Sequence, residues 1–225
     1  MPRVLLFDID NTLLYSGGAG SLAMARAFEQ LYGVPNGFAG IEFSGRTDRF
    51  ILESGLGTHG ISGGCEAHLD EFTTLYYGLL PEAMREREGH LMPGFPQLLE
   101  RLSKEEARLG LATGNFSEAA RIKLGFYDID GFFAGCGFGE LSLERADVVR
   151  AAIEAVADGA RPEDVLVIGD TPHDITSALD NGVVAVGVAT GTYSADDLRK
   201  SGAHLSFGDF SDWQAVAEAL LSFTA

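Results

Sequence analysis

Basic residues are scarce in this chain of 225 residues, which has 16 lysines and arginines against 33 aspartates and glutamates and a formal net charge of −17. Nucleic acids and anionic membranes are bound through basic surfaces, so this balance argues against both as partners. An anionic substrate would be repelled as well. Any site for such a substrate must therefore carry its own local positive charge.

Cysteines and long apolar runs are also few. Cys65 and Cys136 lack the spacing of a metal site and are interpreted as small buried side chains in a reducing cytoplasm. The longest apolar stretches, such as residues 183–189, are far shorter than the ~20 residues of a membrane-spanning helix. The apolar run from Val4 to Asp8 is too short for the core of a signal peptide. We therefore expect a cytoplasmic protein, and a monomer or weak homodimer because no exposed apolar stripe requires a partner.

Short runs rich in Val, Leu and Ile alternate with helical patterns along most of the chain. Continuous apolar runs of this length are typical of strands buried on both faces of a parallel sheet. They lie at residues 4–8, 109–113, 165–170 and 183–188, with a weaker one at 204–207. Helical spacing of apolar residues occurs at 95–103, 117–124, 146–156, 174–181 and 212–223. This alternation predicts an α/β fold with a three-layer, Rossmann-like parallel-sheet core.

One stretch interrupts the alternation. Between residues 14 and 91 only helical patterns are evident, at 19–32, 47–55 and 65–80, with no convincing strand. This stretch is too long for an ordinary crossover between strands, so we predict an inserted all-helical domain. The expected division is a core of residues 1–15 and 92–225 and an insert of residues 16–91.

Acidic residues end the first predicted strand. Alternation places Asp8 and Asp10 on the same side of the chain, at the carboxyl edge of the sheet, where open parallel sheets bind ligands. Two neighbouring carboxylates repel each other unless a cation or a shared proton intervenes. Mg²⁺ is the expected partner because it prefers oxygen ligands. The alternative is a solvated turn in which Asp10 caps a helix.

The second strand runs into Thr113-Gly114-Asn115 at the start of a helix. A hydroxyl and free backbone N–H groups at a helix N-terminus can hold a phosphate, although the same tripeptide is also a common turn. Arg145 lies at the start of the helix predicted at 146–156, and its positive charge could balance the charge of a phosphoryl group. The alternative is a surface arginine.

The third such strand ends at Gly169-Asp170, and Asp174 begins the helix after it. Asp170 would be a metal ligand at the end of its strand. Asp174 would either cap the helix N-terminus or hold a metal-bound water.

Together these residues occur in a specific order: Asp8-Ile9-Asp10-Asn11-Thr12, then Thr113-Gly114-Asn115, then a base on the next helix, then Gly169-Asp170 followed by Asp174. This order resembles the four motifs of the haloacid dehalogenase superfamily, which are mostly phosphatases. The resemblance runs through the whole chain and includes Pro93-Gly94 and Lys123-Leu124. The position of the insert is similar to that of the helical-cap branch, which includes phosphoglycolate phosphatase-like enzymes.

The resemblance implies a Mg²⁺-dependent phosphoric monoester hydrolase that acts on a small phosphorylated metabolite, such as phosphoglycolate or a sugar phosphate. It implies that Asp8 is the nucleophile and a metal ligand, and that Asp10 is the general acid and base, with its backbone carbonyl on the metal. Thr113 and Arg145 would hold the phosphoryl oxygens. Asp170 would bind Mg²⁺ directly and Asp174 through water.

Two basic residues depart from a simple match. The third-motif base is usually Lys in this superfamily, whereas the candidate here is Arg145, and Lys123 is a rival for the same role. Arg46, in the segment 45–48 that looks like the cap loop facing the aspartates, is the expected specificity residue. It could grip a second anionic group of the substrate, or it could be a surface arginine at a helix start.

Three alternative functions deserve comparison. A phosphomutase needs only a cap that keeps water from the phosphoenzyme. A haloacid dehalogenase uses the same nucleophile without a metal or a proton donor at the position of Asp10, so Asp10 argues against it. A phospho-accepting receiver module is roughly half this length and has no helical insert.

Overall fold

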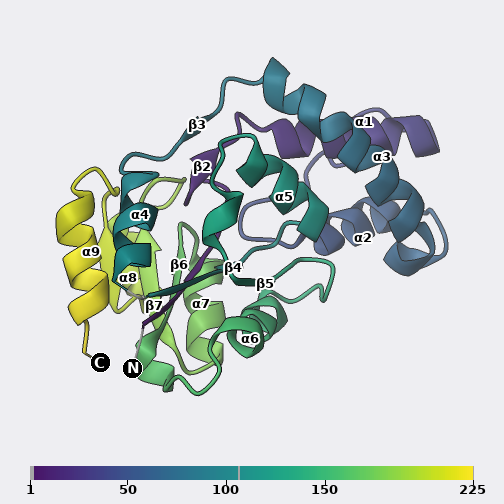
Figure 1. Ribbon diagram of the computed structural model, residues 1–225. Coiled ribbons are helices and arrows are strands. Elements are labelled where there is room, and N and C mark those ends of the chain that lie inside the picture. Colours follow the sequence, from purple (N-terminus) through teal and green to yellow (C-terminus); the bar gives the residue numbers. More distant parts are fainter. Residues whose placement is uncertain (1–2, 106, 225) are drawn as a thin grey trace.

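The computed structural model describes residues 3–105 and 107–224 and shows a parallel sheet flanked by helices, with a helical unit at one end (Figure 1). Residues 1–2, 106 and 225 of the predicted core lie outside the described residues. The sheet has the strand order β5-β4-β1-β6-β7-β8, and every neighbouring pair is parallel. The strands are β1 (Val4–Phe7), β4 (Arg108–Ala112), β5 (Gly135–Gly137), β6 (Val165–Gly169), β7 (Val184–Val188) and β8 (Leu205–Phe207).

Alternating side chains of the central strand β1 fill two separate cores. Leu5 and Phe7 pack on the face covered by α4 (Gln97–Lys104) and α9 (Trp213–Ser222). Val4 and Leu6 pack on the opposite face, which α6 (Arg145–Val156), α7 (Pro172–Asp180) and α8 (Ala195–Lys200) cover. Because β1 is apolar at every position and fully buried, it fits only a strand with a helical layer on each side. The predicted three-layer α/β core is confirmed.

Some core elements were absent from the sequence prediction. Strand β5 consists of two glycines and a cysteine and so has no apolar run. Helix α8 is short and mostly polar, and a capping box between Ser194 and Asp197 starts it. Two short 3₁₀ helices, Asp130–Phe132 and Pro162–Asp164, complete the core.

The stretch between the first and second core strands is helical, as expected, but a two-residue antiparallel pair closes its base. Leu14 of β2 (Leu14–Tyr15) pairs with Leu91 of β3 (His90–Leu91), so the expectation of no strand from residue 14 to residue 91 was wrong. Each of these strands is too short to show a pattern in the sequence.

The helices α1 (Ala19–Tyr32), α2 (Asp48–Thr58) and α3 (Gly64–Glu86) pack around their own aromatic cluster, which includes Phe28, Phe38 and Phe72. Figure 1 shows this unit beyond the end of the sheet, with α5 (Ser117–Gly125) between the two. Phe116 and Ala119 from the start of α5 belong to the same cluster. The helical unit is therefore seated on the core through α5. Among the described residues, no helix combines the length and apolarity needed to cross a bilayer.

Close packing of α6 on the edge strand β5 depends on Gly137. A Cβ there would lie 2.0 Å from the carbonyl oxygen of Val148 and 2.8 Å from the amide nitrogen of Ala152. We expect Gly137→Ala to lower the free energy of unfolding by about 1–3 kcal/mol, because backbone atoms cannot move aside cheaply. Gly78→Ala is the matched control, since Gly78 lies exposed inside α3 with nothing within 4 Å of the added Cβ.

The control should raise stability by about 0.5–1 kcal/mol because alanine is the better helix former. Urea unfolding followed by circular dichroism measures both changes. Equal effects of the two substitutions would contradict the packing argument.

Candidate active site

A cavity of about 270 Å³ opens at the carboxyl end of β1, between the sheet and the helical unit. The strand order places β4 on one side of β1 and β6 on the other, which is the switch point where open α/β sheets bind ligands. The predicted residues that line the cavity are Asp8, Asp10, Arg46, Gly114, Asn115, Arg145 and Asp170. Thr113 and Asp174 are not part of its lining.

Three carboxylates cluster at the floor, and two of them, Asp8 and Asp170, line the cavity. One oxygen from each of Asp8, Asp170 and Asp174 lies within 4.8 Å of the others, and all three residues are buried. Burial raises the pKa of Asp8, although the adjacent Arg145 opposes this shift. Burial also raises the pKa of Asp170, and the charges of Asp174 and Asp8 add to the effect.

Arg145 lies against this acidic cluster, at the first turn of α6. Its Nη2 is 2.7 Å from Asp8 Oδ1 and 2.7 Å from Asp174 Oδ1, and donates to the Ala112 carbonyl at 3.1 Å. Burial alone would lower the pKa of Arg145, but the charges of Asp8 and Asp174 raise it further above its ordinary value. The Nε of Arg145 is buried and has no partner among the described residues, so a donor is left over.

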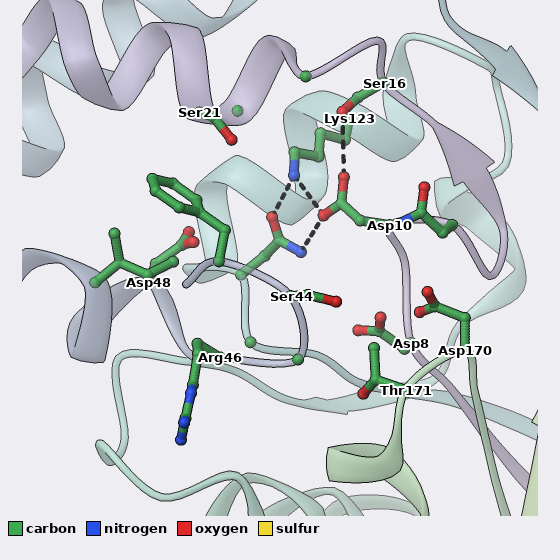
Figure 2. Close-up of a pocket in the computed structure, with 18 of the residues that line it drawn as sticks. Asp8, Asp10, Ser16, Ser21, Ser44, Arg46, Asp48, Lys123, Asp170 and Thr171 are labelled. Atoms are coloured by element: carbon green, nitrogen blue, oxygen red, sulfur yellow. Dashed lines mark hydrogen bonds and ion pairs between the residues drawn. The ribbon is translucent and has the colours of Figure 1, made fainter. Parts of the chain in front are cut away.

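Asp10 is held by a different cation. Its Oδ2 is 2.6 Å from Lys123 Nζ and accepts from Asn115 Nδ2 at 2.8 Å, and its Oδ1 accepts from Ser16 Oγ at 3.3 Å. Figure 2 shows Lys123 reaching from its helix to Asp10. Desolvation by itself would raise the pKa of Asp10, but the Lys123 charge and these hydrogen bonds outweigh it and lower the pKa. The structure thus separates the two basic candidates: Arg145 contacts Asp8 and Lys123 contacts Asp10.

The Thr113–Asn115 turn supports this arrangement. The Oγ1 of Thr113 is fully buried and accepts from Asn115 Nδ2 at 2.9 Å, which fixes the amide that holds Asp10. A Cβ at Gly114 would lie 2.2 Å from the Arg46 carbonyl oxygen and 2.7 Å from an Arg145 nitrogen. Glycine at this position is what lets the insert loop and Arg145 approach the turn.

The structure shows one of the two roles considered for Asp174. It forms a capping box with Thr171, the N-cap residue of α7. Its other oxygen, Oδ1, pairs with Arg145, and the residue is a member of the acidic cluster.

Arg46 lines the cavity with its loop, but its guanidinium group turns away from the aspartates (Figure 2). Nη2 is 3.3 Å from Glu42 Oε2, and Cζ lies 4.6 Å from the centre of the Phe50 ring. The expected grip on an anionic substrate group is therefore not the arrangement that this structure shows.

Residues of the insert that were not predicted as site residues also reach the cavity. Asp48 is 8% exposed, and its carboxylate accepts from Phe116 N at 2.9 Å. Tyr76, expected to be part of the insert core, is buried there and also lines the cavity. Only the position of Asp48 in the segment 45–48 could have pointed to it. Helical spacing alone made Tyr76 an ordinary core residue.

The acidic cluster suits a divalent cation. Three carboxylates face one guanidinium group, which leaves an excess of two negative charges in a buried place. Asp170 Oδ2 is buried and has no partner among the described residues, and a Cβ at Gly191 would lie only 1.9 Å from it. An all-oxygen donor set of this kind matches the preference of Mg²⁺. Asp10 is not a member of this cluster, and its carboxylate is held by Lys123 and Asn115.

Comparisons with known proteins found relatives of this chain among phosphatases and hydrolases. A 5'-nucleotidase of Pseudomonas aeruginosa is 31% identical over 138 residues, which cover 60% of this chain and 60% of that protein. A phosphoglycolate phosphatase of Rhodospirillum rubrum is 26% identical over 229 residues, covering 95% of this chain and 91% of that protein. The solved structure of a hydrolase from Pseudomonas syringae shares the fold, with a TM-score of 0.74 and 23% identity over 98% of this chain and 100% of that one.

The sequence profile of a family described as haloacid dehalogenase-like hydrolase matches residues 2–182, which include all four motifs. The resemblance drawn from those motifs is confirmed, and the chain belongs to the haloacid dehalogenase-like hydrolase family.

Proposed function

We propose that this protein is a Mg²⁺-dependent phosphohydrolase that cleaves a small phosphate monoester through an aspartyl-phosphate on Asp8. The observation that carries the proposal is the position of Asp8. Its carboxylate lines the cavity 2.7 Å from the guanidinium of Arg145, and one of its oxygens lies within 4.8 Å of a carboxylate oxygen of Asp170. A nucleophilic carboxylate needs positive charge around it before a phosphate dianion can approach.

In the first step a carboxylate oxygen of Asp8 forms a bond to phosphorus, and the bond from phosphorus to the ester oxygen breaks. Asp10 gives its proton to the departing alcohol. In the second step water attacks phosphorus, Asp10 takes a proton from that water, and the Asp8–phosphate bond breaks to release inorganic phosphate. The lowered pKa of Asp10 favours the carboxylate form, which the second step requires, and it disfavours the protonated form that the first step requires and that Asp10 regains from the attacking water.

Asp8 and Asp170 would hold Mg²⁺ directly, with the Asp10 carbonyl, and Asp174 would act through water. When bound, the ion supplies the charge that offsets the excess of negative charge on the floor. Arg145 holds Asp8 in place and offers donors to the phosphoryl oxygens. The Thr113 hydroxyl fixes Asn115, and Gly114 and Asn115 line the cavity at this turn. The N–H groups of Thr113 and Asn115 already donate within the protein, to the Gly137 carbonyl and to Thr113 Oγ1, so they are not free for a phosphate.

The helical insert would act as a cap over this site. Its loop 45–49 docks on the core: Asp48 N donates to the Gly114 carbonyl at 2.7 Å, and Arg49 donates to the Glu140 carbonyl at 2.9 Å. Such a cap excludes water during phosphoryl transfer and must open for product release.

The two curated relatives, a 5'-nucleotidase and a phosphoglycolate phosphatase, support hydrolysis of a phosphate monoester. The residue at position 10 argues against a dehalogenase, which needs no proton donor there. A phosphomutase remains the second candidate, and the product distinguishes it, because a mutase returns an isomeric ester and no phosphate. The free thiols of Cys65 and Cys136 support a cytoplasmic enzyme.

Replacement of the nucleophile tests the mechanism. We expect Asp8→Asn to abolish Mg²⁺-dependent release of phosphate from p-nitrophenyl phosphate while the circular dichroism spectrum is unchanged. Asp70→Asn, on the exposed side of α3, is the matched control and should retain full activity. Activity of Asp8→Asn comparable to the wild type would show that another group is the nucleophile.

Gly191→Ala tests the metal site without removing a ligand. The added Cβ pushes on Asp170 Oδ2, so we expect the Mg²⁺ concentration for half-maximal activity to rise at least ~10-fold. Thermal stabilisation by Mg²⁺ should weaken in parallel, which provides a readout independent of turnover. Gly125→Ala, where nothing lies within 4 Å of the new Cβ, should leave both quantities unchanged. An unchanged response of Gly191→Ala to Mg²⁺ would remove Asp170 from the metal site.

Replacing the two basic residues should lower kcat/KM in ways that depend differently on the leaving group of the ester. Arg145 acts on the phosphoryl group, so Arg145→Ala should lower kcat/KM about 10²–10³-fold for every ester. Lys123 acts through Asp10, so Lys123→Ala should reduce kcat/KM much more for alkyl phosphates than for p-nitrophenyl phosphate, whose leaving group needs no proton. Equal losses for both esters in Lys123→Ala would contradict this assignment.

A further inference from the structure

The side of the cavity opposite the acidic floor is where the leaving alcohol must lie, and the insert builds it. We call it the leaving-group half, and it is lined by Ser21, Met24, Phe43, Ser44, Asp48, Ile51 and Tyr76. Its polar groups are hydroxyls and one carboxylate. The apolar members leave room for a carbon skeleton but offer no charge.

Every basic side chain that lines the cavity has an acidic partner. Arg145 pairs with Asp8 and Asp174, Lys123 with Asp10, and Arg46 with Glu42. Lys123 also donates to Asn115 Oδ1 at 2.6 Å, so two of its three donors are in use. A second anionic group on the substrate would therefore meet cations that acidic partners already neutralise, with Arg46 Nε as a donor that has no described partner.

Asp48 differs from the other lining acids. Lys123, whose charge acts on Asp48, forms its ion pair with Asp10, and among the described residues Asp48 has no ion-pair partner. Phe116 N donates to Oδ2, whereas no described donor reaches Oδ1. Burial raises the pKa of Asp48 to about 6, so it is mostly ionised at pH 7.5. A carboxylate oxygen that lines the cavity and that no described donor reaches can accept a hydrogen bond from the substrate.

We propose that the substrates are phosphate esters of alcohols that carry a hydroxyl or ammonium group and no second anion, and that Asp48 is the residue that selects them. This inference rests on the proposed phosphohydrolase function and narrows its substrate class. An ammonium or hydroxyl group satisfies the free oxygen of Asp48. A carboxylate, as in phosphoglycolate, meets a like charge in a place sheltered from water.

Three esters of nearly the same size provide the test: ethanolamine phosphate, ethylene glycol monophosphate and phosphoglycolate. They differ only in an ammonium, a hydroxyl or a carboxylate at the far end. Each is measured at pH 7.5 with Mg²⁺, both as a substrate and as a competitive inhibitor of p-nitrophenyl phosphate hydrolysis. The inhibition constants give a ranking even where turnover is slow.

We expect wild-type kcat/KM for the ammonium and hydroxyl esters to exceed that for phosphoglycolate by at least ~10-fold. Asp48→Asn keeps an acceptor for Phe116 N but loses the charge. It should reduce the preference for ethanolamine phosphate over phosphoglycolate at least ~10-fold, with a gain for phosphoglycolate itself. Asp70→Asn should leave the ranking unchanged.

The outcomes separate this inference from the proposed function. No Mg²⁺-dependent hydrolysis of any ester, p-nitrophenyl phosphate included, would overturn the phosphohydrolase and the inference with it. Hydrolysis with phosphoglycolate ranked first would overturn the inference alone, and loss of that rank in Arg46→Gln would assign the carboxylate to Arg46. If Asp48→Asn fails to fold, the wild-type ranking decides.

Discussion

Repulsion between carboxylates is the constraint around which this site is built. Three parallel strands end at one place on the sheet, and the chain puts Asp8, Asp10 and Asp170 there, with Asp174 one helix turn away. Two cations from different helices offset part of this negative charge. Arg145 at the start of α6 pairs with Asp8, and Lys123 of α5 pairs with Asp10. The helices are positioned by the layers on the sheet, so the α/β packing decides which acid each cation meets. The part of the negative charge that remains lies on the floor, where a divalent ion fits.

The insert is hydrogen-bonded to the core at Gly114 and Phe116, in and directly after the Thr113–Asn115 turn. Asp48 bonds through its backbone to Gly114 and through its side chain to Phe116, and the missing side chain of Gly114 makes that approach possible. Asp48 therefore joins the insert to the core and also lines the cavity. If the insert is the cap proposed here, opening it would break these bonds, which would couple closure to recognition of the leaving group through one residue.

Much of the core could be predicted because its signals are local. Val4–Phe7 and Val165–Gly169 are continuous apolar runs, and the acids that follow them mark the carboxyl edge of the sheet. Strand β5 could not be found this way, because Gly135–Gly137 is a strand only through its pairing with β4. The same holds for the site. Asp8 and Asp170 follow strands, whereas the contact of Lys123 with Asp10 and the orientation of Arg46 depend on how α5 and the insert pack. The sequence alone left the choice between Arg145 and Lys123 open for that reason.

Charge connects the composition of the chain to its chemistry. A protein with a net charge of −17 repels phosphate esters, and here each cation lining the cavity is already paired with an acid. Local arginine and lysine therefore bring the site close to neutrality without making it positive. Under the proposed mechanism, a bound metal ion would supply the attraction for a phosphate dianion, at the floor beside Asp8. The leaving-group half, several side chains away, keeps the negative character of Asp48. Two ends of one cavity can thus have opposite preferences, with phosphate drawn to the floor and a second anion rejected at the cap.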